Sequence, residues 1–356
     1  MKTISILLLT FLFLKGNAQE NDTTSKIILN GYAEVYYSFD FANPNNHEKP
    51  SFIYNHKKHN ELGLNLLLTS VKYTNKTSRV NFGFMAGNYA QYNLASEPNW
   101  AKIIYEANFG IKLSAHNNIW LDAGIMPSHI GFESAVGKDC WTLTRSIMAE
   151  NTPYYETGIK LSYSNKKSNL LLSLLLLNGW QKIKSPDNFI KPAWGLQVNY
   201  KASTKLTFNY SNFLGTDKPD SLNATRLFHN FYAIYEPTAK LGFTVGFDLG
   251  RDKYDSKQYG NWYSIIAIMQ YGFNKKIKMA YRAEYYRDIK QIMITTNTPN
   301  GFEVFGISAN INYSFTNKTQ FRLEGKLYQS KDKIFNFNSN FSNNNSSITG
   351  AFMIKI

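Results

Sequence analysis

The sequence has little of several features that large proteins usually carry. Its 356 residues include one cysteine, Cys140, so an intrachain disulfide is excluded. Only 18% of the residues are charged, yet the mean hydropathy is -0.35 and no stretch reaches the roughly 20 apolar residues that a spanning helix needs. A bundle of transmembrane helices is therefore excluded. With 24 Tyr, 25 Phe and 6 Trp, the chain is also too aromatic to stay disordered.

The N-terminus has the pattern of a secretory signal. Lys2 gives a positive start, residues 4–14 are apolar, and Gly16-Asn17-Ala18 supplies small residues for cleavage. We expect residues 1–18 to be removed and residues 19–356 to form one domain. Loss of Lys2 and Lys15 lowers the net charge from +14 to +12. Export favours lipid phosphates or small anions over nucleic acid as partners of this basic chain.

The rest of the chain repeats one unit, in which about ten residues alternate between apolar and polar before a break rich in Asn, Lys, Ser or Gly. Leu62, Leu64, Leu66 and Leu68, with polar or small residues between them, are a clear case. This period of two indicates strands with one apolar face. Sixteen stretches show it, near residues 29–39, 62–69, 80–92, 101–113, 119–126, 155–163, 170–178, 194–201, 205–214, 226–236, 240–251, 262–273, 277–288, 302–315, 319–331 and 346–356.

The connections between these stretches alternate in length. Short ones are built from Asn and Lys, as at 74–77, 116–118 and 274–276, whereas those after odd strands are long. Short periplasmic turns and long external loops are typical of bacterial outer-membrane barrels. We therefore predict an all-β fold, a transmembrane antiparallel up-and-down β-barrel of about 16 strands. The leucine-rich strand at 170–178 has the least certain register, because leucine also occupies its inward positions.

The central third resembles a known family. The segments 123–133 (AGIMPSHIGFE), 142–146 (TLTRS), 154–158 (YYETG) and 178–180 (NGW) are similar to β-barrel porins of the OmpL-like type from the Bacteroidota. The resemblance implies an outer-membrane porin that passes small hydrophilic solutes by diffusion.

The strand positions opposite the apolar ones define the expected lumen. Basic residues predominate there, and this predicts a water-filled interior with a weak anion preference. The alternative is that charges on neighbouring strands neutralise one another and leave little net field. The basic positions are Lys72, Arg79, Lys102, Lys112, Lys160, Lys201, Lys205, Lys240, Lys278, Arg282, Arg322 and Lys326, and the acidic ones are Glu34, Glu61, Glu106, Asp122, Glu156, Asp248, Glu284 and Glu324.

The longest connection, 127–153, is the candidate constriction. Thr142 as an N-cap, apolar residues at 143, 147 and 148, and Pro153 beyond them predict a short helix within 141–151. We expect this loop to fold into the barrel, with Glu133 and Arg145 facing each other or the solute. The alternative is an external loop in which the two residues form a structural ion pair.

Two other classes of protein remain open. A rim hydrolase would use Ser128, His129, Ser146 or His229, but no Gly-x-Ser-x-Gly turn is present. His47, His56 and His59 share one polar loop. We interpret them as solvated side chains, and a weak metal site is the less favoured alternative. A non-conducting barrel could bind lipopolysaccharide phosphates through loop lysines at 57, 58, 182, 184, 191, 253 and 257. We expect no enzyme activity, cofactor or metal, with outer-membrane lipids, small solutes or anions, and a homo-oligomer as partners.

Overall fold

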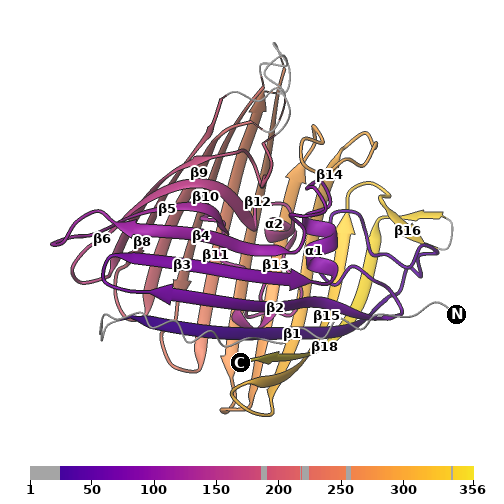
Figure 1. Ribbon diagram of the computed structural model, residues 1–356. Helices are drawn as coiled ribbons and strands as arrows, with labels where there is room; N and C mark the ends of the chain where they lie inside the picture. The colour runs from indigo at the N-terminus through magenta and orange to yellow at the C-terminus, as the bar shows by residue number, and fades with distance from the viewer. Residues whose placement is uncertain (1–24, 186–190, 217, 219–223, 254–257, 338–339) are drawn as a thin grey trace, which may run out of the picture.

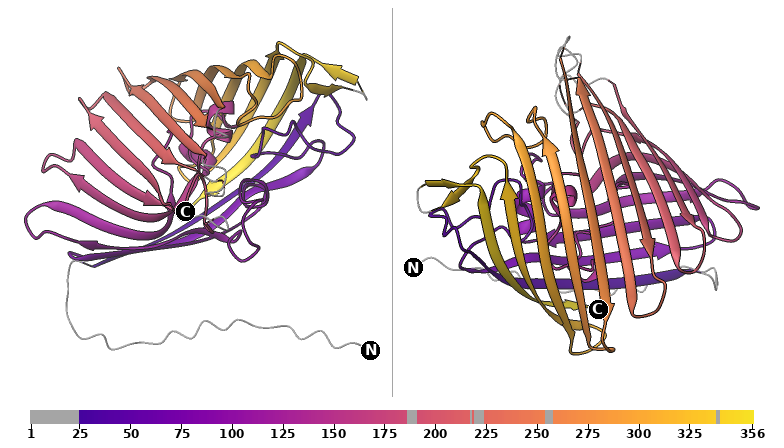
Figure 2. Two further views of the ribbon diagram at one scale, coloured as in Figure 1. Left: turned by 90° about the horizontal axis from the view of Figure 1, so that it is seen from above. Right: turned by 180° about the vertical axis from the view of Figure 1, so that it is seen from behind.

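The computed structural model describes residues 25–185, 191–216, 218, 224–253, 258–337 and 340–356. The expected signal peptide, residues 1–18, lies outside them. Sixteen described strands pair antiparallel with their chain neighbours, and the last closes on the first (Figures 1 and 2). They are β1 (Lys26–Asp40), β2 (Leu62–Thr74), β3 (Ser78–Ala86), β4 (Ile104–Lys112), β5 (Asn118–Pro127), β6 (Tyr155–Ser164), β7 (Leu170–Leu177), β8 (Ala193–Lys201), β9 (Leu206–Gly215), β10 (Thr225–Tyr235), β11 (Leu241–Lys253), β12 (Tyr259–Gly272), β13 (Ile277–Asp288), β14 (Phe302–Ser314), β15 (Thr319–Ser330) and β18 (Asn344–Lys355).

The predicted closed, up-and-down barrel of 16 strands is confirmed. Alternation determines which face each residue occupies. In β11, even-numbered residues from 242 to 252 are buried, whereas Phe243, Val245 and Leu249 are exposed on the outer face. The same pattern holds in β7, where Leu172 and Leu174 are exposed and Leu175 and Leu177 are buried. These two inward leucines pack in an interior cluster around Trp180, so the uncertain strand register follows the general rule.

Several predicted strand boundaries were wrong. The third strand ends at Ala86, because Gly87 has a positive φ of 114° and the chain then forms helix α1 (Asn88–Asn93). The fourth strand begins at Ile104 rather than 101. The connection expected at 252–261 is shorter, since β11 continues to Lys253 and β12 begins at Tyr259. The loop expected at 332–345 contains a small hairpin of β16 (Phe335–Phe337) and β17 (Asn340–Ser342).

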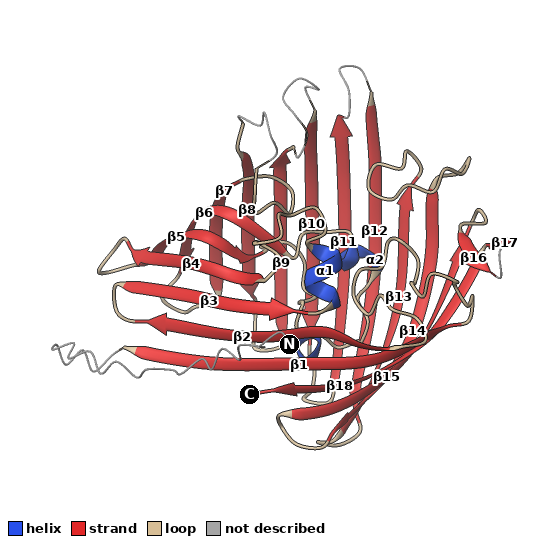
Figure 3. Cartoon of the chain, turned by 45° about the vertical axis from the view of Figure 1, so that its right-hand side comes forward, coloured by secondary structure: helices blue, strands red, loops and turns tan. Residues whose placement is uncertain are grey.

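Residues 128–154, named the inner loop from here on, enter the barrel. They contain the 3-10 helix η1 (Gly137–Asp139) and the single-turn helix α2 (Ile147–Glu150), and Figure 3 shows α1 and α2 surrounded by the strands. The predicted short helix exists, but its N-cap is Ser146, whose hydroxyl accepts from the Ala149 N–H, and not Thr142. No helix in the described part of the chain has the length and apolar character needed to cross a membrane.

Candidate functional site in the lumen

The inner loop runs from one rim of the barrel to the other. Near its start, His129 Nδ1 lies 2.8 Å from a Glu156 oxygen and its Nε2 lies 2.8 Å from the Asn212 carbonyl oxygen. At its tip, Asp139 pairs with Lys355 at 2.5 Å, and Lys138 donates to the carbonyl oxygen of Asn317. Asn317 belongs to a short turn, so the tip reaches the periplasmic rim.

One group of inward charges holds this loop against β13, β14 and β15. Arg282 pairs with Glu324 at 2.7 Å, and the Glu324 carboxylate accepts from the backbone N–H of Thr144 at 2.6 Å. Glu284 accepts from the Ile147 N–H at 2.6 Å. These contacts satisfy backbone groups of a chain segment that has no strand partner.

Two more cations complete this group. Arg322 donates to the carbonyl oxygens of Gly137 at 2.8 Å and Trp141 at 2.6 Å, and Lys326 donates to that of Arg145 at 2.9 Å. All five wall residues, which we call the anchor cluster, are buried. They are Arg282, Glu284, Arg322, Glu324 and Lys326.

Glu133 and Arg145 occupy different places from those expected. Arg145 donates to three inner-loop carbonyl oxygens, those of Ser134 (2.7 Å), Leu143 (2.7 Å) and Ala135 (3.1 Å). Glu133 accepts from the Ser146 backbone N–H at 3.2 Å and lies 3.7 Å from Arg282. The two residues form no direct ion pair in the described chain. Burial raises the pKa of Glu133, although Arg282 opposes this shift.

Another group of inward charges lies towards the periplasmic rim, and its basic side chains are more exposed than those of the anchor cluster. Lys72 is 3.6 Å from Glu106, and Arg79 Nε donates to Asp122 at 2.6 Å. We call the other three the rim lysines, namely Lys112, Lys160 and Lys278. They form no ion pair with any residue that the structure describes, and Lys278 is exposed whereas the other two are half-buried.

The remaining predicted lumen positions fall into three groups. Those outside the strands are Lys102, Lys205, Lys240 and Glu61, so alternation does not orient them. Lys201 is the last residue of β8 and is exposed. Glu34, Glu156 and Asp248 are buried inward-facing residues.

Sequence reasoning missed a second segment inside the barrel, the loop between β1 and β2. The Glu150 carboxylate of the inner loop accepts from the backbone N–H groups of Tyr54 (3.0 Å) and Asn55 (3.2 Å). His56 lies 2.8 Å from Glu34 and is fully buried, and burial lowers its pKa while Glu34 opposes the shift. The interpretation of His56 as a solvated side chain was wrong.

The described residues contain no group of three or more His, Cys, Asp or Glu that could hold a metal ion. His59 Nδ1 accepts from the Asp40 N–H at 2.8 Å. Near the start of the inner loop, both ring nitrogens of His129 have partners, and Ser128 Oγ lies 3.4 Å from Glu156 rather than against the imidazole. A serine activated by this histidine would need that imidazole nitrogen.

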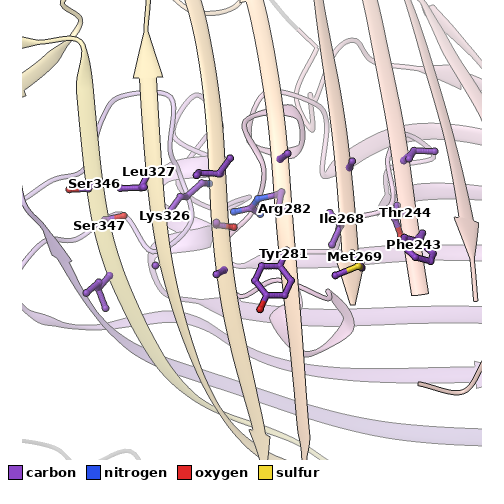
Figure 4. Close-up of a pocket in the computed structure, with 18 of the residues that line it drawn as sticks. Phe243, Thr244, Ile268, Met269, Tyr281, Arg282, Lys326, Leu327, Ser346 and Ser347 are labelled. Atoms are coloured by element: carbon purple, nitrogen blue, oxygen red, sulfur yellow. The ribbon is translucent and has the colours of Figure 1, made fainter. Parts of the chain in front are cut away.

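A separate groove of about 810 Å³ lies on the outer wall, across β11 to β15 and β18 (Figure 4). Arg282 and Lys326 also border it, but their charged ends bind the inner loop and Glu324 on the other side of the wall. The groove therefore faces the membrane and is not part of a solute path. Small residues form its floor, namely Ala267, Ala283, Ala309 and Gly325.

A closed barrel with an apolar outer face, short turns at one rim and a loop folded inside defines the class of outer-membrane porins. The chain belongs to the family described as "Putative beta-barrel porin-2, OmpL-like", whose model matches residues 26–356. The family and the fold support an outer-membrane location and a porin channel. No curated protein sequence matches this chain.

Three solved structures show the same fold. An anion-selective porin from Comamonas acidovorans has a TM-score of 0.63 at 10% identity, covering 93% of this chain and 100% of that chain. The outer-membrane channel DcaP of Acinetobacter baumannii has a TM-score of 0.62 at 9% identity, with coverage of 94% and 98%. OmpT of Vibrio cholerae, in its trimer form, has a TM-score of 0.59 at 9% identity, with coverage of 94% and 100%.

Proposed function

We propose that this porin passes small hydrophilic solutes by passive diffusion and that it weakly prefers anions. The observation that carries the preference is the set of rim lysines, Lys112, Lys160 and Lys278, which project inward and form no ion pair among the described residues. Asp122 lies opposite Lys160 in the sheet, but Arg79 binds its carboxylate. Unpaired positive charge in a water-filled opening lowers the electrostatic barrier for anions. The fold is shared with a porin described as anion-selective, which is consistent with this proposal.

The preference is weak because most other inward charges are paired. The anchor cluster contains three cations and two carboxylates, and it also binds inner-loop carbonyl oxygens. Lys72 with Glu106 and Arg79 with Asp122 add two compensated pairs. The alternative in which charges on neighbouring strands neutralise one another therefore applies to much of the inner wall, but not to the rim lysines.

We propose that the inner loop is the constriction, and that Glu133 and Arg145 maintain its shape rather than bind the solute. Arg145 ties together backbone carbonyls on both arms of the loop, at 134, 135 and 143. Glu133 binds the first turn of α2 through Ser146. Both roles require desolvated, fully engaged side chains, and both side chains are largely withdrawn from solvent.

The test is the reversal potential of single channels in a planar bilayer under a potassium chloride gradient. The triple variant Lys112→Gln, Lys160→Gln, Lys278→Gln should lose the anion preference and still conduct. A matched control removes three positive charges from the outer wall, with Arg251→Gln, Arg287→Gln and Lys290→Gln. Cation selectivity in the unaltered protein, or equal shifts in both triples, would overturn the proposal.

Further parts of this proposal concern processing and partners. We propose cleavage after Ala18, which intact mass of the exported protein measures directly. We also propose a homo-oligomer, consistent with the trimer form of one protein of the same fold, and native mass spectrometry reports it. Outer-membrane lipids including lipopolysaccharide are the proposed surrounding partners. We propose no catalytic activity, which the engaged state of His129 supports.

A further inference from the structure

The outer wall carries charge in one sector only. Strand positions facing outward are apolar or uncharged around the described barrel, apart from four at the external ends of strands in one sector, which runs from β11 to β14. Those four are Arg251, Lys253, Arg287 and Glu303, on β11, β13 and β14. A charge on the membrane-facing side costs up to about 2–4 kcal/mol at the bilayer midplane and little near the interface. The clustering of these outward charges in one sector of the rim therefore suggests that they bind a partner there.

Two of these residues, Arg251 and Arg287, line a hollow of about 620 Å³ on the outer wall. Arg251 lies opposite Asn261 and Leu227 in the sheet, and Tyr263 lies opposite Arg287. The loop after β13 adds the exposed Lys290. The cationic and hydrogen-bonding lining includes His229, Arg251, Asn261, Tyr263, Arg287 and Lys290.

Positive charge exceeds negative charge around this hollow. Glu303 is the carboxylate closest in register, and it lies 3.7 Å from Arg287 and 3.8 Å from Lys331. Arg251 stacks over Tyr259 at 4.4 Å and forms no ion pair with any described residue. A stacked guanidinium keeps its hydrogen-bond donors free, and its planar fork matches phosphate oxygens.

The height of the hollow along the barrel wall indicates which part of a lipid it faces. One outward step below the level of Arg287 and Glu303, the row becomes largely apolar, with Phe231, Phe247, Ile265 and Phe305 all well exposed. Arg251 lies one step higher, above the exposed Leu249. Two residues along a strand span about 6.6 Å. The basic groups therefore lie directly above the belt that contacts acyl chains, where lipid headgroups are found.

We propose that this hollow binds the phosphorylated headgroup of an outer-leaflet glycolipid, of the lipopolysaccharide class. Arg251, Arg287 and Lys290 hold the phosphate, while Leu227, Leu249 and the belt below contact its acyl chains. The site rests on the outer-membrane location but not on conduction. It differs from the loop-lysine site considered from the sequence, since among the lysines of that site that the structure describes, Lys253 alone lies near it. Lys257 is outside the described residues.

The experiment measures binding of purified lipopolysaccharide to the refolded full-length protein in detergent, with dephosphorylated lipopolysaccharide and inorganic phosphate as further probes. The triple variant Arg251→Gln, Arg287→Gln, Lys290→Gln should weaken binding of lipopolysaccharide by at least about tenfold, as expected for lost charge-assisted hydrogen bonds. The matched control is the rim-lysine triple, which removes equal charge from the lumen and should bind as the unaltered protein does.

Each other outcome overturns the lipid site. Equal losses of lipopolysaccharide binding in both triple variants would indicate attraction by net charge alone. If dephosphorylated lipopolysaccharide bound equally well, the phosphate would have no role in recognition. Inorganic phosphate that competes as well as the lipid would indicate a site for free anions. Conductance of the outer-wall triple, recorded in parallel, should be unchanged, so this proposal and the porin proposal can fail separately.

Discussion

Two sets of inward-facing charges in the same barrel behave differently. The anchor cluster on β13 and β15 is buried beneath the inner loop, and each member binds a partner. The rim lysines on β4, β6 and β13 share the same inward orientation but lie towards the periplasmic rim, where they are exposed or half-buried. Alternation along a strand directs a side chain to the interior, and contact with the inner loop determines whether that side chain is buried or exposed to water.

The largest expected effect comes from removing the loop itself. Deleting residues 134–150 exposes the anchor cluster to water, so both sets become alike and the open cross-section widens. Single-channel conductance should rise severalfold, because a wider aqueous path carries more ions. Heat-shifted gel mobility verifies that the barrel has folded. Unchanged conductance from folded barrels would refute the constriction.

The next largest expected effect is on the free energy of unfolding, which should depend on the anchor cluster but not on the rim lysines. Glu324→Gln leaves Arg282 buried without its closest carboxylate, and should lower the free energy of unfolding by about 3–5 kcal/mol. The exposed Lys278→Gln should change it by less than about 0.5 kcal/mol. Urea unfolding in lipid vesicles, followed by tryptophan fluorescence, measures both. Similar losses would show that the clusters are not energetically distinct.

Salt should reveal which set controls selectivity. Exposed charges are screened as the Debye length falls from about 10 Å at 0.1 M to about 3 Å at 1 M ionic strength, and buried ones are screened much less. The anion preference should therefore decline as mean salt rises at a fixed gradient ratio. A preference independent of salt would assign selectivity to the anchor cluster instead.

The smallest effect belongs to the tip of the loop. Asp139 and Lys355 form a partly exposed pair, worth at most about 1 kcal/mol. Asp139→Asn should leave unfolding nearly unchanged but increase current noise in single-channel records, because the tip is released from the rim. Lys276→Gln, in the separate turn at 274–276, serves as the control for the loss of one charge at this rim. Equally quiet traces from both variants would argue against a tethered tip.

The wall was predictable because its rule is local. Period-two patterning and the length of connections sufficed for 16 strands and for the side on which Arg282 or Lys278 lies. Errors occurred where another local preference intervened, as at Gly87, whose positive φ ends β3 and lets α1 begin.

The interior was less predictable, because its contacts join residues far apart in sequence. Thr144 meets Glu324, and Glu150 meets Tyr54, through a fold that no spacing encodes. Glu133 and Arg145 do lie in the loop that enters the barrel, but their partners are backbone groups, Ser146 and Arg282, which no sequence spacing indicated. The family resemblance pointed to this loop without specifying its path.

The position of the loop tip also bears on the order of folding. Gly137 lies beside the Glu34 carboxylate of β1, while its neighbour Asp139 pairs with Lys355 of β18. These two strands form the seam that closes the barrel. The tip can make both contacts only once the first and last strands have met, so seating of the tip is a late event in assembly. A barrel caught before closure would lack these contacts, while the anchor cluster on β13 and β15 could already hold the rest of the loop.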